Sequence, residues 1–149
     1  MRQLFKKILV PYDFSRSAAK ALRVAVSLAV RHDGVLLVMH AVPPIHPPHG
    51  RPILPAAAEI EAAGSRLAAD VGRAVAGRRL RRVRSWVMVG PPASCILEAA
   101  RQADAIVMGT LGRSGLPHLL LGSVAERVIR HAEVPVLTVR AARPRRRRS

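Results

Sequence analysis

The glycine-rich segment from Gly109 to Ser123 contains the residue types that proteins use to bind phosphate groups. It follows an apolar strand pattern and ends in the Gly122-Ser123 step, where a helical pattern begins. Glycines let backbone N–H groups approach an anion closely, and a helix N-terminus adds unpaired N–H groups and the positive end of its dipole. The segment therefore predicts a phosphate site that needs no lysine. The same glycines also fit a simpler role, in which they turn the chain and cap a helix.

The common nucleotide-binding fingerprints are absent from the sequence. It contains no Gly-x-x-x-x-Gly-Lys-Ser/Thr motif, and Gly109, Gly112 and Gly115 form Gly-x2-Gly-x2-Gly rather than the Gly-x-Gly-x-x-Gly of Rossmann folds. The serines and histidines match no nucleophile motif, no paired carboxylates are available for acid–base catalysis, and no Cys/His spacing fits a zinc site. We therefore expect neither catalytic residues nor a metal held by protein side chains.

Apolar patterns alternate between strand and helix along the chain. Short apolar runs predict strands at residues 4–10, 35–42, 83–89, 105–108 and 134–139. Apolar residues at three- and four-residue spacing predict helices between Ser15 and Gly34 and at 56–76, 93–101 and 123–131. Strands that alternate with helices require right-handed crossovers, so we predict an α/β fold, a three-layer α/β/α sandwich with a five-stranded parallel sheet. Between the second strand and the second helix, residues 43–55 contain six prolines, and we expect an irregular loop without helix or ladder pairing.

Length and composition predict one globular domain with two strongly basic segments. The 149 residues are half hydrophobic, and the formal net charge is +16. Eleven arginines lie in two clusters, at 78–84 and 140–148, so we predict a domain over residues 1–140 and a disordered arginine-rich tail over 141–149.

The apolar runs are too short for a membrane span or a signal peptide, and the lone Cys95 cannot form an internal disulfide. We therefore expect a cytoplasmic protein.

The glycine segment also matches the motif of a known family. Gly109-x2-Gly112-x9-Gly122-Ser123 resembles the Gly-x2-Gly-x9-Gly-Ser/Thr motif of the ATP-binding branch of the universal stress proteins. Residues 7–13 are similar to the opening strand of that family, residues 119–132 to its closing helix and residues 135–140 to its closing strand. The resemblance covers about residues 4–140.

This resemblance implies a fold and a nucleotide site. The fold is adenine nucleotide alpha hydrolase-like, with strand order 3-2-1-4-5 and ATP between strands one and four. Asp13 would lie near the ribose, whose hydroxyl groups donate hydrogen bonds to a carboxylate, and Val42 would offer backbone contacts to adenine. The positions carried over to the ATP site are Pro11, Tyr12, Asp13, Val42, Met108, Gly109, Gly112, Arg113, Gly122, Ser123 and Val124. Mg²⁺ would accompany the phosphates, whose hard oxygens it prefers. Asp13 also fits a second role as the N-terminal cap of the first helix.

The family resemblance further implies a regulatory role in stress response, with nucleotide-dependent conformation or partner choice and at most slow ATP hydrolysis. It implies a homodimer paired through the last strand, Val134 to Val139. The alternative function is a polyanion or nucleic-acid binder that acts through its arginine clusters, since arginine neutralises phosphates and releases counterions. Aromatic residues make up only 3% of the chain, which leaves few platforms for base stacking. Nonspecific polyanion binding through the C-terminal tail is expected in either case.

Overall fold

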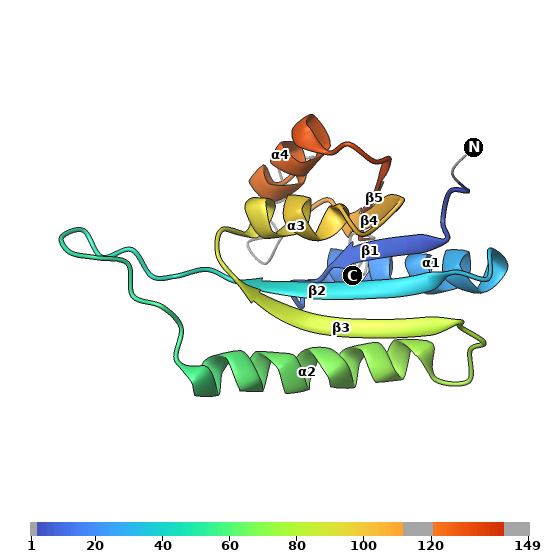
Figure 1. Ribbon diagram of the computed structural model, residues 1–149, viewed down its shortest axis with the longest axis horizontal. Helices are drawn as coiled ribbons and strands as arrows, with labels where there is room; N and C mark the ends of the chain where they lie inside the picture. The colour runs from blue at the N-terminus through green and yellow to red at the C-terminus, as the bar shows by residue number, and fades with distance from the viewer. Residues whose placement is uncertain (1–2, 112–120, 142–149) are drawn as a thin grey trace, which may run out of the picture.

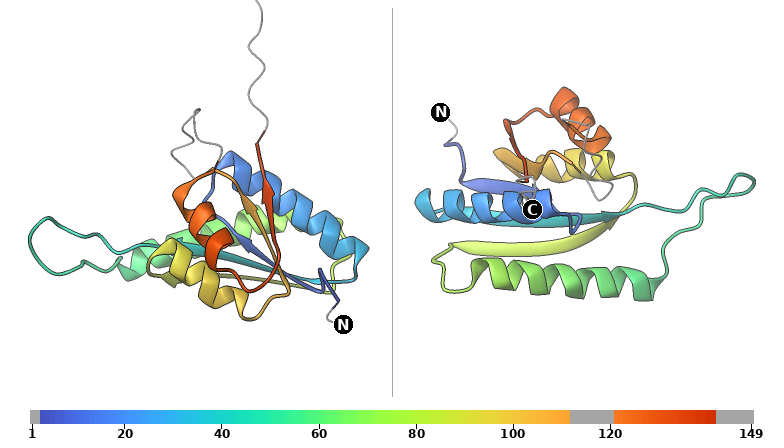
Figure 2. Two further views of the ribbon diagram at one scale, coloured as in Figure 1. Left: turned by 90° about the horizontal axis from the view of Figure 1, so that it is seen from above. Right: turned by 180° about the vertical axis from the view of Figure 1, so that it is seen from behind.

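Strands and helices alternate along the parts of the chain that the computed structural model describes, residues 3–111 and 121–141. The strands are β1 (Lys7–Pro11), β2 (Val35–Val42), β3 (Arg82–Val89), β4 (Ala105–Gly109) and β5 (Val136–Val139). The helices are α1 (Arg16–Arg31), α2 (Ala57–Val75), α3 (Pro92–Ala100) and α4 (Ser123–His131). All paired strands are parallel, in the order β3-β2-β1-β4-β5, with helices on both faces (Figures 1 and 2). The predicted three-layer sandwich and its 3-2-1-4-5 order are confirmed.

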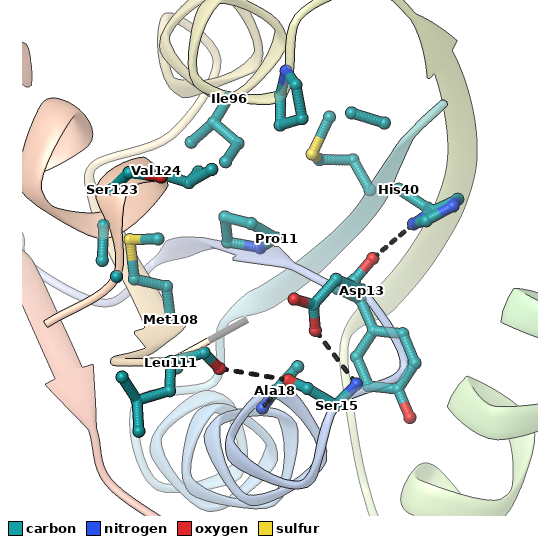
Figure 3. Close-up of a pocket in the computed structure, with 17 residues that line it drawn as sticks. Pro11, Asp13, Ser15, Ala18, His40, Ile96, Met108, Leu111, Ser123 and Val124 are labelled. Atoms are coloured by element: carbon teal, nitrogen blue, oxygen red, sulfur yellow. Dashed lines mark hydrogen bonds between the residues drawn. The ribbon is translucent and has the colours of Figure 1, made fainter. Parts of the chain in front are cut away.

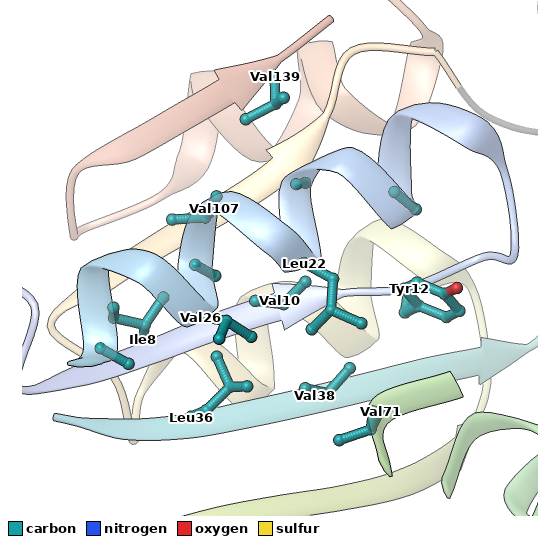
Figure 4. Close-up of a cluster of buried hydrophobic side chains, with 14 of the residues drawn as sticks. Ile8, Val10, Tyr12, Leu22, Val26, Leu36, Val38, Val71, Val107 and Val139 are labelled. Carbon is teal, nitrogen blue, oxygen red and sulfur yellow. The ribbon is translucent and has the colours of Figure 1, made fainter. Parts of the chain in front are cut away.

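The central strand β1 is buried on both faces. Ile8 and Val10 pack with α1 and α2, whereas Leu9 between them packs with α3 and α4, and all three are 0% exposed. Figure 4 shows the first of these two apolar clusters, with Leu22 and Val26 of α1 above the sheet. Because successive side chains of a strand point to opposite faces, a strand covered on both sides needs a continuous apolar run, as this one has.

Helix α1 has clear start and stop signals. The hydroxyl oxygen of Ser15 accepts a hydrogen bond from the Ala18 N–H at 3.1 Å, which caps the helix. At the other end, Asp33 adopts a left-handed φ of 48° and the Gly34 N–H donates to the Ala29 carbonyl at 2.7 Å. A Cβ at Gly34 would lie 2.5 Å from the Phe5 carbonyl oxygen, so only glycine fits this turn into β2.

Two strands are shorter than predicted. The first begins at Lys7 rather than residue 4, because Phe5 has a left-handed φ of 66° that breaks the extended backbone. The last begins at Val136 rather than residue 134, because Pro135 has no N–H and contributes only its carbonyl, which accepts the Ile106 N–H at 2.9 Å. Of the predicted tail, residues 142–149 lie outside the described residues. None of the described helices combines the length and apolarity needed to cross a membrane.

Residues 43–55 form an arm that projects beyond the end of β2 (Figures 1 and 2). Ile45 and Ile53 exchange two backbone hydrogen bonds across it, at 2.9 and 2.8 Å. The expectation that the prolines exclude all ladder pairing is wrong at this point, because the antiparallel bridge uses two residues that keep their N–H groups. The side chains of Ile45, Ile53 and Leu54 are 65%, 56% and 69% exposed on the arm.

Gly109, the last residue of β4, packs directly on the first turn of α1. A Cβ at this position would lie 2.8 Å from the Ala18 nitrogen and closer still to the Ser17 hydroxyl oxygen. Backbone atoms this close cannot make room for a Cβ unless the helix or the strand shifts. The absence of a side chain therefore sets how closely α1 approaches β4.

We expect Gly109→Ala to lower the free energy of unfolding by about 1–3 kcal/mol, the usual cost of overpacking a close contact. The matched control is Gly72→Ala in α2, where no described atom lies within 4 Å of an added Cβ. That substitution should raise stability by about 0.5–1 kcal/mol, because alanine has the higher helix propensity. Urea unfolding of both variants measures the difference. Equal stability of Gly109→Ala and the wild type would contradict the close approach.

Candidate functional site

A pocket of about 350 Å³ opens where β1 and β4 separate, at the point of the sheet where strand order reverses (Figure 3). The two strands pair over only two residue pairs, Ile8 with Ala105 and Leu9 with Ile106. Beyond these pairs the connections of β1 and β4 leave in different directions, which creates a crevice at the carboxyl ends of the strands. Such a position and size are typical of small-molecule sites in α/β folds.

Eight of the eleven residues predicted for the nucleotide line this pocket: Pro11, Tyr12, Asp13, Met108, Gly109, Gly122, Ser123 and Val124. Val42 does not line it, and its carbonyl accepts the Gly90 N–H at 3.1 Å; the preceding residue, Ala41, lines the pocket instead. Gly112 and Arg113 lie outside the described residues. Segments distant in sequence, from β1, β4 and the start of α4, therefore meet at one pocket.

The N-terminus of α4 forms one wall of the pocket. Gly122 is the N-cap of this helix and provides no side-chain cap, and its carbonyl accepts the Glu126 N–H at 2.9 Å. The N–H groups of the three residues after Gly122 precede this first helical hydrogen bond, and those residues line the pocket. A glycine-capped helix start at a pocket wall is an arrangement that binds anions, because the N–H groups and the helix dipole both favour negative charge.

Asp13 lies across the pocket in the turn between β1 and α1 (Figure 3). Its Oδ1 accepts the Ser15 N–H at 3.0 Å, which fixes the turn two residues before the helix. The alternative role of Asp13 as the cap of α1 is wrong, because Ser15 holds that position. The carboxylate at the pocket wall is an acceptor for hydroxyl groups of a ligand.

The remaining wall is mainly apolar. Met39 of β2, Ile96 of α3 and Met108 of β4 line it and are nearly fully buried. Sulfur-containing and branched apolar side chains offer a polarizable surface for a flat ring. The pocket thus combines a helix N-terminus, a carboxylate and an apolar surface. Among the described residues no three metal-binding side chains lie together.

Both ends of the glycine segment are anchored beside α1. The Thr110 N–H donates to the Val139 carbonyl at 3.0 Å, and the Thr110 carbonyl accepts the Gly122 N–H at 2.6 Å. The Leu111 carbonyl accepts the hydroxyls of Ser17 and, at 3.5 Å, Ser15. Sequence analysis passed over Ser17, although a second hydroxyl residue at the start of a helix is a recognisable signal for such contacts.

An aromatic cluster supports the turn behind Asp13. The Phe14 ring makes edge contacts with Tyr12 at 5.2 Å and with buried His40 at 4.9 Å, and the Arg66 guanidinium lies 4.0 Å from its centre. Phe14 has a left-handed φ of 65°, a conformation that the surrounding packing must hold in place. His40 Nδ1 lies 2.7 Å from the Tyr12 carbonyl oxygen. Sequence analysis missed His40, whose only signal is a polar residue in an apolar strand.

Tyr12 connects this turn to α2. Its hydroxyl donates to Asp70 Oδ2 at 2.8 Å, and Arg73 pairs with the other carboxylate oxygen. Burial, the hydrogen bond to Asp70 and the negative charge of Asp70 raise the Tyr12 pKa to about 12, against the opposing effect of Arg66 and Arg73. The contact joins residues 58 positions apart and fixes one side of the pocket to the outer helix.

The family model described as the universal stress protein family matches residues 4–140. The chain belongs to the universal stress protein family. A universal stress protein of Thermus aquaticus is 37% identical over 139 residues, which cover 92% of this chain and all of the relative. A universal stress protein of Methanocaldococcus jannaschii is 36% identical over 146 residues, which cover 92% of this chain and 83% of that relative.

Solved structures of universal stress proteins have the same fold. The protein UspA from Lactobacillus plantarum superposes with a TM-score of 0.74 at 27% identity, over 93% of this chain and all of the other. A universal stress protein in complex with cAMP has a TM-score of 0.67 at 25% identity, over 94% of this chain and all of that one. One from Archaeoglobus fulgidus in complex with dAMP has a TM-score of 0.66 at 26% identity, over 93% and 99%. The adenine nucleotide alpha hydrolase-like fold is therefore shown for this universal stress protein.

We expect the Tyr12 phenol to titrate near pH 12 in the folded protein and near pH 10 when denatured. The folded state then binds more protons between these values, so the free energy of unfolding falls as pH rises through that interval. The chain has a single tyrosine, so the near-ultraviolet absorbance of tyrosinate reports Tyr12 alone.

Asp70→Ala should lower the Tyr12 pKa in the folded protein, because it removes the hydrogen bond and the charge that raise it. Glu61→Ala, which removes an exposed acid from the same helix, is the matched control and should leave the titration unchanged. Titration of the folded wild type near pH 10 would contradict the contact with Asp70.

Proposed function

We propose that this universal stress protein binds ATP in the pocket between β1 and β4. In this proposal it is a cytoplasmic regulator in stress response, whose conformation or choice of partner depends on the bound nucleotide. The observation that carries the proposal is the glycine-capped N-terminus of α4 facing the pocket that also contains Asp13. The relatives in complex with cAMP and dAMP support nucleotide binding by this fold.

In the proposed complex, each part of ATP contacts a part of the pocket with complementary chemistry. The phosphates bind at Gly122, Ser123 and Val124, where backbone N–H groups and the α4 dipole favour negative charge. Gly112 and Arg113 of the motif would add to this end. The ribose hydroxyls donate to Asp13, and the adenine ring packs on the apolar wall. Mg²⁺ would be held chiefly by the phosphate oxygens, which suit it as hard ligands.

The described pocket offers little for catalysis. Asp13 is the single carboxylate among its described lining residues, and it accepts the Ser15 N–H; His40 also lines the pocket, with its Nδ1 2.7 Å from the Tyr12 carbonyl oxygen. Efficient hydrolysis needs a positioned general base for the attacking water. The proposal therefore assigns a regulatory role with slow hydrolysis at most.

The direct experiment is to denature the purified protein and identify any released nucleotide by chromatography and mass. Calorimetric titration of nucleotide-free protein with MgATP, dAMP and cAMP then ranks the ligands. Stoichiometric ATP, or binding of MgATP tighter than the other two, supports the proposal. No released nucleotide and no binding of any of the three would overturn it.

We expect Gly122→Val to weaken ATP binding by about 2 kcal/mol or more, roughly 30-fold, because the added side chain occupies the phosphate position. Gly122 has φ −73° and ψ 160°, an extended conformation that valine adopts readily, so the fold should persist. Ser27→Val on the exposed side of α1 is the control and should bind ATP as the wild type does. Wild-type affinity in a folded Gly122→Val protein would remove the site assignment.

We also propose a homodimer formed through β5. This strand ends the sheet, and in the described chain its one strand partner is β4. Leu137 on β5 is 42% exposed and Ile129 on α4 is 45% exposed. An edge strand with exposed apolar side chains is a template for pairing with a second chain.

Leu137→Lys should shift the protein from dimer to monomer in sedimentation velocity, because it places a charge at the proposed contact. Val89→Lys is the matched control, since Val89 is also 42% exposed but lies on β3, at the opposite edge of the sheet. The control should remain dimeric. A monomeric wild type, or equal effects of the two variants, would contradict pairing through β5.

A further inference from the structure

A strongly basic surface lies at the other edge of the sheet, at the amino end of β3. We define the β3 basic surface as Arg78, Arg79, Arg81, Arg82, Arg84 and Trp86. The five arginines are exposed and belong to the turn after α2 and the first half of the outer strand (Figure 1). The nucleotide pocket lies at the carboxyl ends of the strands, so this surface is a separate feature.

The charge of this surface is not neutralised within the described chain. The sequence has no acidic residue between Asp70 and Glu98. The ion pairs among residues 3–111 and 121–141 involve Lys6, Arg73 and Arg130, and none of the five arginines. Five exposed cations within seven residues repel one another, and binding of a polyanion would relieve that repulsion.

One face of β3 presents these groups in a row. Val83 and Val87 point towards α2, so Arg82, Arg84 and Trp86 point to the opposite face. Residues two apart on a strand are about 6.6 Å apart along it, which sets a regular spacing of cations. The Arg84 guanidinium carbon lies 5.7 Å from the centre of the partly buried Trp86 ring. Guanidinium and indole planes are both platforms on which unpaired bases stack.

We propose that the β3 basic surface binds single-stranded nucleic acid, with its phosphates at the arginines and a base stacked on the Arg84–Trp86 pair. A membrane surface is the less fitting partner, because residues 78–86 offer no exposed apolar side chain that could insert into a bilayer beside the cations. The large apolar residue among these arginines, Leu80, is partly buried and packs against the core. Backbone neutralisation with few base contacts makes the binding tolerant of sequence and dependent on salt.

The test uses Trp86, the only tryptophan of the chain, as the probe. Oligothymidylate longer than the usual site size of about 4–16 nucleotides is titrated into the full-length protein at several salt concentrations. We expect saturable quenching of Trp86 fluorescence, with log K falling by about 0.7 per neutralised phosphate for each tenfold rise in salt.

We compare two double variants of equal net charge. The first is Arg82→Gln/Arg84→Gln, and the second is Arg23→Gln/Arg31→Gln. The second pair removes exposed arginines of α1 instead. The β3 variant should bind about tenfold more weakly, with a salt slope shallower by about 1.4, whereas the α1 variant should bind within about twofold of the wild type. Circular dichroism verifies that both variants are folded.

A third variant replaces Arg143 and the four arginines at 145–148 with serine, which removes the tail cations. It should keep the quenching of Trp86. Equal losses in the two paired variants would overturn the proposal, since net charge alone would then explain binding. Binding without a change in Trp86 fluorescence would also overturn it, as would quenching by anionic phosphatidylserine vesicles but not by the oligonucleotide.

Discussion

The pocket depends on the short pairing between the two central strands. β1 and β4 share only two residue pairs. Contacts at either end of this short pairing keep the two strands in position. At the amino end, the Asp104 carboxylate accepts the Lys7 N–H and the Asp104 N–H donates to the Lys7 carbonyl, both at 2.9 Å. At the carboxyl end, Gly109 lets the first turn of α1 pack against β4, where the ladder has ended. The described walls of the crevice are therefore held in place by contacts at both ends of the two-pair ladder.

The same arrangement explains why the N-termini of two helices lie at the pocket. Helices α1 and α4 both begin at the carboxyl ends of the central strands, as the parallel topology requires. The first turn of α1 is occupied by its own cap and by the carbonyl of Leu111, whereas α4 starts at a glycine with no side chain. Both helix starts line the pocket, but only the start of α4 lacks a side-chain cap on its N–H groups. The difference follows from the residue at the cap, Ser15 in one case and Gly122 in the other.

Much of this structure follows from local sequence signals. Apolar runs located all five strands, and the family resemblance named residues of β1, β4 and α4 that line one pocket. The errors fell where a contact or a backbone feature that the apolar pattern does not encode decides the outcome. Pairing of Ile45 with Ile53 gave order to a proline-rich segment, and the partner of Tyr12 lies 58 residues away in α2. Strand ends were displaced by single backbone features, the left-handed Phe5 and the missing N–H of Pro135.

The arm between β2 and α2 has a thermodynamic consequence of its own. Each of its six prolines fixes a φ angle, and the bridge between Ile45 and Ile53 closes the hairpin that they shape. A segment restrained in this way loses less conformational entropy when a partner binds to it. The exposed side chains of Ile45, Ile53 and Leu54 lie on this segment, so burying them would bring the gain of apolar contact with a smaller loss of chain entropy than on a loop of equal length without prolines or a bridge.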